Sequence, residues 1–283
     1  MNVDAAVTYA ERHALHALLV QRGDEIVSER YAGGYDADKP HALYSGTKSF
    51  WGVLAVAAQD DGVLDVDEPV SATLPEWSRG AKARVRLRDL LQLTSGIGFG
   101  GLGAGVPSFD KAAAVDLKDE PRTTFTYGGI PLQVFGAVLA RKLAPRGLSP
   151  QAYLHERILD RIGMRVASWR TLKDGTHPLP TGAFVTAREW RKFGLLVRDG
   201  GMWKKKTIVP RTPLARCFTG SDTNPRYGLG WWLSPLAKHP DVVYASGAGG
   251  QAMYVVPSAG IVAVKFGGAA SYKHDAFLKR LLG

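Results

Sequence analysis

The sequence predicts an α+β fold in which both ends of the chain build one antiparallel sheet, flanked by helices, with a helical subdomain inserted. Apolar and polar residues alternate with the period of strands near both termini, whereas the middle of the chain has helical periodicity. Hydrophobic residues make up 45% of the 283 positions, enough to bury a large core. We therefore expect one domain over residues 1–283, with a sheet subdomain from residues 1–64 and 226–283 and a mainly helical subdomain from residues 65–225.

The N-terminal part is expected to contain a helix over residues 3–13 and two strands, residues 16–21 and 25–31, joined at Arg22-Gly23-Asp24. Residues 50–58 form an apolar run without proline that is closed by Asp60-Asp61-Gly62, which is typical of a buried helix with a glycine stop.

Later helices are expected from Ser149-Pro150 onward and from the capping box Thr186-Ala187-Arg188-Glu189 through Val197. Strand periodicity then returns in four segments, and the chain ends in a helix. The strands are residues 227–233, 242–245, 251–256 and 261–266, and the helix is residues 272–281.

Ser45 and Lys48 are the first candidate functional residues. If Ser45 starts a helix, the two side chains share a face, and the amides of the first turn favour negative charge there. A lysine amine buried beside the apolar run would lose solvation, so its pKa would fall and it could activate Ser45 as a base. The alternative is a serine that caps the helix and a lysine that reaches solvent. The local pattern fits both.

The same Ser-x-x-Lys spacing occurs again at Ser108 and Lys111. There it follows a flexible stretch, Gly103-Ala104-Gly105-Val106-Pro107, and opens a short alanine-rich run. We interpret Ser108 as a capping serine and Lys111 as a solvated lysine.

Several segments in order resemble the serine hydrolases that include class C β-lactamases, penicillin-binding D-peptidases, and related esterases and amide hydrolases. They are Ser45-Gly46-Thr47-Lys48, residues 61–70, residues 85–97 with their Thr94-Ser95-Gly96 turn, Phe125-Thr126-Tyr127, and residues 158–164. Their order and spacing extend through nearly the whole chain. The resemblance implies a catalytic domain with a nucleophilic Ser45 and with Lys48 as its base.

In that family a Tyr-x-Asn tyrosine passes protons between the serine, the lysine and the leaving group, and Tyr127 matches it. The asparagine is replaced by Gly129, so the side-chain amide that would bind a substrate carbonyl is missing. From the residues alone, Tyr127 could instead be a packing residue of an amphipathic helix.

The family's Lys-x-Gly or His-x-Gly element matches Ala245-Ser246-Gly247, in which the glycine is present and the cation is absent. By the resemblance, the backbone amides of Ser45 and Ala248 would form an oxyanion hole, and Gly129, Gly247 and Gly249 would border the substrate. Losing the cation should weaken binding of a substrate carboxylate. Residues 247–250 also fit a simple turn or bulge in a strand.

We therefore expect a serine hydrolase that cleaves a small-molecule ester or amide through an acyl-enzyme on Ser45, with Lys48 as base and Tyr127 as proton shuttle. Carboxylesterase-like activity with weak or no β-lactamase activity is expected. The alternatives are a catalytically silent binding protein of the same fold, or a true β-lactamase or D-peptidase. No cofactor is expected.

Two adjacent tryptophans in a predicted strand, Trp231 and Trp232, must point to opposite faces, so only one can meet the core. We assign Trp231 to the substrate pocket, with a packing role as the alternative for either residue. Cys217 is the only cysteine and is expected to be a buried packing residue. His41 is expected to satisfy local hydrogen bonds. The histidines lack ligand spacing, so no metal site is expected.

The formal net charge of +10 suggests a polyanion partner, but neither basic run, residues 79–88 or 204–206, is interleaved with aromatics, so we expect no nucleic-acid binding. Residues 98–103 match Gly-x-Gly-x-x-Gly, yet a helix precedes them and a loop follows, which argues against a dinucleotide site. Residues 96–107 are expected to be a mobile loop beside the active site, able to act as a lid.

No apolar run reaches the length of a membrane span. The first residues lack the basic and apolar regions of a secretory signal. The chain as written is thus expected in the cytoplasm, or in the periplasm or outside the cell if a leader was removed. The sequence does not indicate an oligomeric state.

Overall fold

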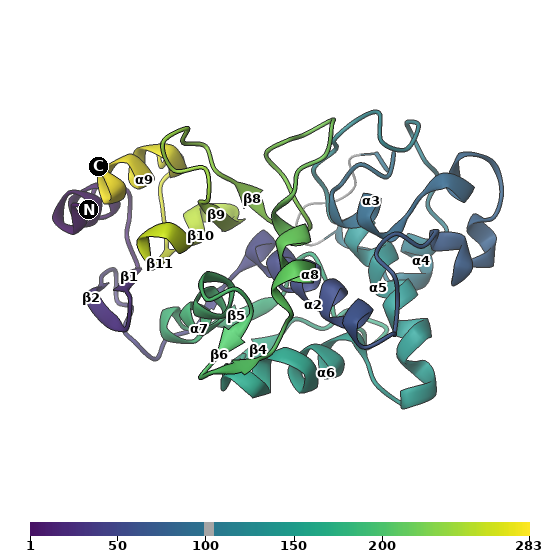
Figure 1. Cartoon of the computed structure of the whole chain (residues 1–283), viewed down its shortest axis with the longest axis horizontal. Coiled ribbons are helices and arrows are strands. Elements are labelled where there is room, and N and C mark those ends of the chain that lie inside the picture. Colours follow the sequence, from purple (N-terminus) through teal and green to yellow (C-terminus); the bar gives the residue numbers. More distant parts are fainter. Residues whose placement is uncertain (99–104) are drawn as a thin grey trace.

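An antiparallel sheet of six strands, drawn from both ends of the chain, lies at one end of the molecule (Figure 1). The computed structural model describes residues 1–98 and 105–283. Within them, the sheet order is β2 (Glu25–Tyr31), β1 (Ala17–Arg22), β11 (Ile261–Phe266), β10 (Gln251–Val256), β9 (Val243–Gly247) and β8 (Trp232–Leu233). The predicted fold class is confirmed. Residues 99–104, which carry most of the Gly-x-Gly-x-x-Gly match and the centre of the predicted loop, lie outside the described residues.

Helices cover both faces of this sheet because its inner strands are apolar on both sides. On β11, Ala263 packs in the cluster with α1 (Val3–Glu11) and α9 (His274–Leu282), and its neighbour Val262 packs in the cluster that contains α7 (Ala187–Arg198). The two termini thus meet on one face, where α1 contacts α9 (Figure 1). This arrangement orients alternate residues of β9, β10 and β11 toward α9.

Further helices and five short strands form the other end of the molecule and the connection to it (Figure 1). The helices are α3 (Leu87–Leu91), α4 (Phe109–Ala113), α5 (Ile130–Leu143), α6 (Pro150–Leu154) and α8 (Arg211–Ala215). Strands β3 (His41–Ala42), β5 (Ala183–Val185) and β4 (Ser168–Trp169) form a small sheet, and β6 (Met202–Trp203) pairs with β7 (Lys206–Thr207) in a hairpin.

Helix α2 (Lys48–Asp60) passes through the centre of the molecule and is buried from Lys48 to Ala58. Two tryptophans fix its position through indole hydrogen bonds. Trp51 donates to the Leu179 carbonyl, and Trp231 donates to the Ser49 carbonyl at 3.0 Å. Helix α2 is therefore anchored by two indole hydrogen bonds. It is also buried, as the apolar run predicted.

The segment from Tyr227 to Leu233 is not the continuous strand predicted from its periodicity. Only Trp232 and Leu233 pair with β9, and Tyr227 forms an isolated bridge with Trp232, so the segment folds back on itself. Gly230 allows this reversal with a φ of 78°, and its N–H donates to the Leu91 carbonyl. The contact with Leu91 joins the sheet end of the molecule to α3.

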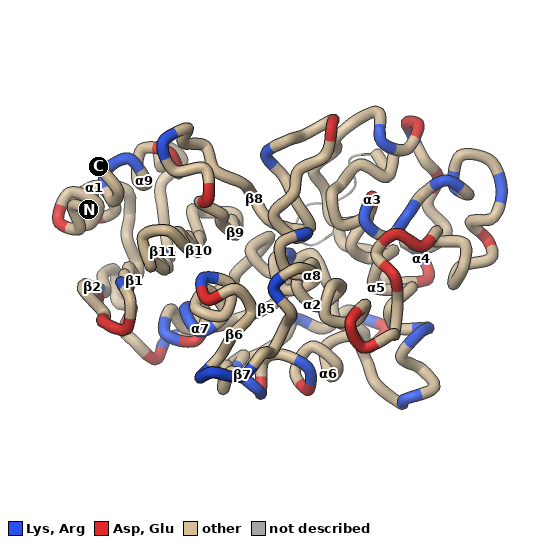
Figure 2. The backbone as a smooth tube through the Cα atoms, in the orientation of Figure 1, with Lys and Arg blue, Asp and Glu red and all other residues tan. Residues whose placement is uncertain are grey.

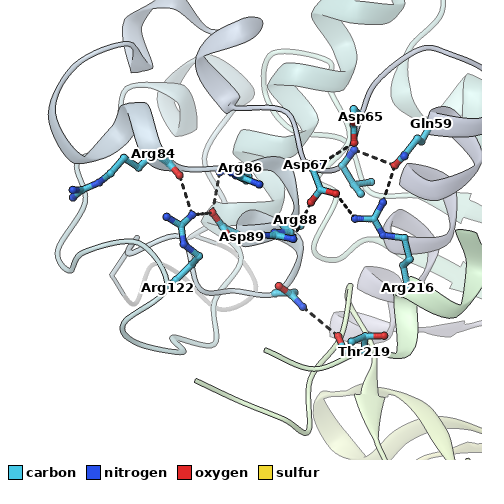
Figure 3. Close-up of polar contacts among 12 residues, drawn as sticks. Gln59, Asp65, Asp67, Arg84, Arg86, Arg88, Asp89, Arg122, Arg216 and Thr219 are labelled. Atoms are coloured by element: carbon cyan, nitrogen blue, oxygen red, sulfur yellow. Dashed lines mark hydrogen bonds and ion pairs between the residues drawn. The ribbon is translucent and has the colours of Figure 1, made fainter. Parts of the chain in front are cut away.

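Basic and acidic positions are interspersed along the chain (Figure 2), and ion pairs connect several of them. Asp67 pairs with both Arg88 and Arg216, at 3.0 and 2.6 Å, which links α3 to the segment after α8 (Figure 3). Lys82 pairs with Asp116, and Arg84 pairs with Glu120. Much of the basic run at residues 79–88 is therefore engaged within the chain. No helix among the described residues is long and apolar enough to cross a bilayer.

Replacing Gly52 with alanine should destabilise the fold, because its Cβ would lie 1.9 Å from the Leu229 carbonyl oxygen. We expect the free energy of unfolding to fall by about 3 kcal/mol, measured by urea denaturation. Gly105→Ala is the matched control, since no atom of residues 1–98 or 105–283 lies within 4 Å of its Cβ position. Equal stability of the two variants would contradict the packing of α2 against Leu229.

Candidate active site

Ser45 lies in a 3₁₀ turn, Tyr44–Thr47, that continues directly into α2. Tyr44 has a φ of 47°, a left-handed conformation that costs a non-glycine residue about 1 kcal/mol or more. Gly46 is required by packing, since its Cβ would lie 2.9 Å from the Trp190 ring. The surrounding residues thus hold the turn in a strained conformation, which places Ser45 at the N-terminal end of the buried helix.

Lys48 is brought against Ser45, with Nζ 2.8 Å from the Ser45 Oγ. The side chain is 2% exposed, and its Nζ also donates to the Pro180 carbonyl at 3.4 Å. Burial lowers the pKa of Lys48 to about 7. The alternative in which this lysine reaches solvent is therefore wrong, and a substantial fraction of the amine is neutral near pH 7.

Tyr127 lies beside Ser45 and Lys48. Its ring centroid lies 4.9 Å from the Lys48 Nζ, and the ring stacks on Trp232 at 5.5 Å between centroids. Burial raises the pKa of Tyr127, an effect opposed by polar contacts of the phenol with Ser45 and Trp232. The phenol therefore stays protonated at neutral pH and can donate a proton.

The loop that carries Tyr127 is anchored to α3. The Thr126 N–H donates to the Leu93 carbonyl at 3.0 Å, and the Arg122 guanidinium lies 2.8 Å from Asp89 (Figure 3). Asp89 is 1% exposed and also accepts the Arg86 N–H. This buried carboxylate thus connects the start of α3 to the loop before Tyr127.

The C-terminal end of β9 contacts the 3₁₀ turn that carries Ser45. A Cβ at Gly247 would lie 2.0 Å from the Leu43 carbonyl oxygen, so only glycine permits this approach. Ala248 follows and lines the pocket beside Ser45. Gly249, with a φ of 72°, turns the chain back into β10. Among the turn and loop hydrogen bonds of the described residues, none is donated by the Ser45 or Ala248 amide.

A pocket of about 400 Å³ opens over Ser45. It is lined by Ser45, Tyr127, Trp232, Tyr244, Ser246, Gly247, Ala248 and His274. A second cavity of about 400 Å³ shares Gly247 and His274 with it and includes Gly249. The structure therefore brings the neighbouring pair Ser45 and Lys48 together with Tyr127 and the Gly247 turn, which are far from that pair in the sequence.

Two residues expected at the substrate are placed elsewhere. Trp231 is fully buried, and its indole donates to the Ser49 carbonyl of α2, so it belongs to the core and Trp232 lines the pocket instead. Because adjacent residues point to opposite sides, one had to face the core, and the fold-back at Gly230 decides which. Gly129 is buried directly before α5 and does not line the pocket.

Sequence reasoning missed Tyr244, Ser246 and His274. Tyr244 and Ser246 alternate on one face of β9, a signal present in the sequence, but His274 comes from the start of α9. His274 Nε2 lies 3.1 Å from the Ser246 Oγ, and its Nδ1 lies 2.6 Å from the Tyr254 hydroxyl. Burial lowers the pKa of His274 to about 4, so the ring is neutral at pH 7.

Other candidates have structural roles. Ser108 caps α4 through its bond from the Lys111 N–H, and Lys111 is exposed, as predicted. Cys217 is buried. His41 stacks on Tyr35 and Phe266, and its buried Nε2 has no hydrogen-bond partner among the described residues, so the expectation that it satisfies local hydrogen bonds is wrong. In the part of the chain that the structure describes, no three His, Cys, Asp or Glu side chains are grouped to hold a metal ion.

The chain is similar to known proteins in sequence and in structure. Residues 9–275 match the beta-lactamase family. The 6-aminohexanoate-dimer hydrolase of Paenarthrobacter ureafaciens is 23% identical over 287 residues, covering 90% of this chain and 73% of that protein.

Two solved structures are similar along nearly the whole chain. A Bacillus anthracis protein described as a 6-aminohexanoate-dimer hydrolase superposes with a TM-score of 0.82 at 18% identity, covering 98% of this chain and 80% of that one. A family VIII carboxylesterase superposes with a TM-score of 0.77 at 18% identity, covering 99% and 94%. The chain therefore belongs to the beta-lactamase family and is a serine hydrolase.

Proposed function

We propose that the protein hydrolyses a small ester or amide through an acyl-enzyme on Ser45. The observation that carries this proposal is the 2.8 Å contact between the buried Lys48 amine and the Ser45 hydroxyl. An amine with a pKa of about 7 can accept the serine proton at neutral pH, which a solvated lysine cannot do.

In the first half of the reaction, the Ser45 Oγ attacks the substrate carbonyl carbon and its proton passes to the Lys48 Nζ. The negative charge that forms on the carbonyl oxygen is stabilised by the amides of Ser45 and Ala248. The Tyr127 phenol donates its proton to the leaving alcohol or amine as the bond to the carbonyl carbon breaks, and it regains a proton from Lys48. In the second half, water attacks the acyl-enzyme, and Ser45 leaves with the proton that the water supplied.

The residues that would recognise the carboxylate and the carbonyl of a β-lactam substrate are changed. Ala245 takes the place of a cation and is 1% exposed, and Gly129 takes the place of an amide side chain. The pocket is instead walled by the aromatic rings of Tyr127, Trp232 and Tyr244. With Gly247 in its lining, this pocket suits a neutral acyl group. The dimer hydrolase and carboxylesterase relatives support an ester or amide substrate.

Ser45→Ala should abolish turnover of short p-nitrophenyl esters while leaving the melting temperature close to that of the wild type. A fluorophosphonate should add to Ser45 of the wild type, as measured by mass spectrometry of the intact protein and its peptides. Ser108→Ala, which removes the other Ser-x-x-Lys serine, is the matched control and should keep full activity and the adduct. A folded wild type that forms no adduct and turns over no ester or amide would instead be a silent binding protein.

The acid limb of the pH profile should report Lys48. Because the amine must be neutral to accept a proton, kcat/KM for a neutral ester should rise as the pH increases through about 7. Tyr127→Phe should lower kcat by about 100-fold to 1000-fold through loss of the proton donor, without moving this limb. An acid limb near pH 10 would contradict a desolvated Lys48.

A further inference from the structure

The turn that carries the Ala248 amide is held from behind by two buried side chains. The Gln251 amide donates to the Gly249 carbonyl at 3.0 Å, and the Lys265 Nζ donates to the Gly250 carbonyl at 3.3 Å. Gln251 also accepts the Gly267 N–H at 3.0 Å. Both carbonyls that follow Ala248 are thus fixed by side chains of the sheet.

Lys265 is unusual for a strand residue because it is fully buried in β11. Its neighbours across the sheet, Leu18 and Ala252, are apolar. The ammonium lies 4.0 Å from the Tyr272 ring centroid. A Cβ at Gly268 would lie 2.6 Å from the Lys265 Nζ, so glycine at that position leaves room for the amine beside the turn.

Nothing on the described part of the chain neutralises this charge. No carboxylate opposes the effect of burial, which lowers the pKa of Lys265 to about 7. The titratable groups that face it are His16, His274 and the phenol of Tyr272. The pKa values of both histidines are lowered, and that of Tyr272 is raised by burial. Near pH 7 these three groups are neutral. The positive charge behind the turn is therefore that of the protonated fraction of Lys265.

We propose that Lys265 is a positioning residue for the oxyanion hole, which fixes the turn that carries Ala248 and places a positive charge behind it. This inference rests on the proposed acyl-enzyme chemistry. When the carbonyl oxygen becomes negative, the turn presents the Ala248 N–H without reorganisation, and the ammonium behind it favours the anion. A side chain that lies outside all three motifs of the site thereby assists transition-state stabilisation.

The test compares Lys265→Met with Gln251→Leu on a neutral p-nitrophenyl ester. Wild-type kcat/KM should pass through a maximum near pH 7 and then decline about threefold as Lys265 loses its proton. Lys265→Met should lower kcat at pH 7 by about tenfold with little change in KM, and the alkaline decline should disappear. Gln251→Leu, which removes the other tether without removing charge, should lower kcat but keep the decline.

Lys265→Gln keeps a hydrogen-bond donor without charge and serves if the methionine variant does not fold. It should also lose the alkaline decline. Unchanged kcat and pH profile in a folded neutral variant would overturn the inference, as would a wild-type profile that lacks the decline. Labelling of wild-type Ser45 by a fluorophosphonate separates the two proposals. If Ser45 is labelled and Lys265 has no effect, only the inference fails, and if Ser45 is inert, both fail.

Discussion

The structure depends on the burial of one amine. Lys48 begins a helix that is buried for eleven consecutive residues, Lys48 to Ala58, and it has no carboxylate to offset its charge. The fold therefore carries the cost of desolvating this group, and a substantial fraction of the amine is neutral near pH 7, as the proposed role of Lys48 as a base requires. In the described residues its charge is compensated by hydrogen bonds to the Ser45 hydroxyl and the Pro180 carbonyl and by the nearby Tyr127 ring. Burying Lys48 therefore costs stability, while it lowers the pKa of the amine into the range that the proposed reaction needs.

Three distant parts of the chain close around that amine. The 3₁₀ turn before α2 supplies Ser45, the loop anchored to Asp89 supplies Tyr127, and the end of β9 supplies Ala248. Each is held by backbone packing that tolerates little change, most clearly at Gly247, where a Cβ would overlap the Leu43 carbonyl. The relative positions of Ser45, Tyr127 and Ala248 are thus set by close main-chain contacts and, for the loop before Tyr127, by the ion pair of Arg122 with Asp89.

The recognition elements have changed while this centre has not. Ala245 and Gly129 contribute no side-chain polar group, and the walls are aromatic, with Trp232 stacked between Tyr127 and Tyr244. Polar groups enter the pocket from the sheet and from α9 instead, through Ser246 and His274. In the proposed function, the groups that would contact the substrate are therefore separate from the pair that would activate Ser45.

The sequence by itself determined the fold class, most helices and strands, and the pair Ser45 and Lys48, because periodicity, caps and helical spacing are local properties. It left open whether Lys48 is buried, and it misplaced Trp231, since strand alternation gives two faces without saying which meets the core. It could not reveal His274 or the contact of Lys265 with the Gly250 carbonyl. Those depend on strand order and on the docking of α9, which arise from contacts between residues far apart in the chain, so only the tertiary structure decided them.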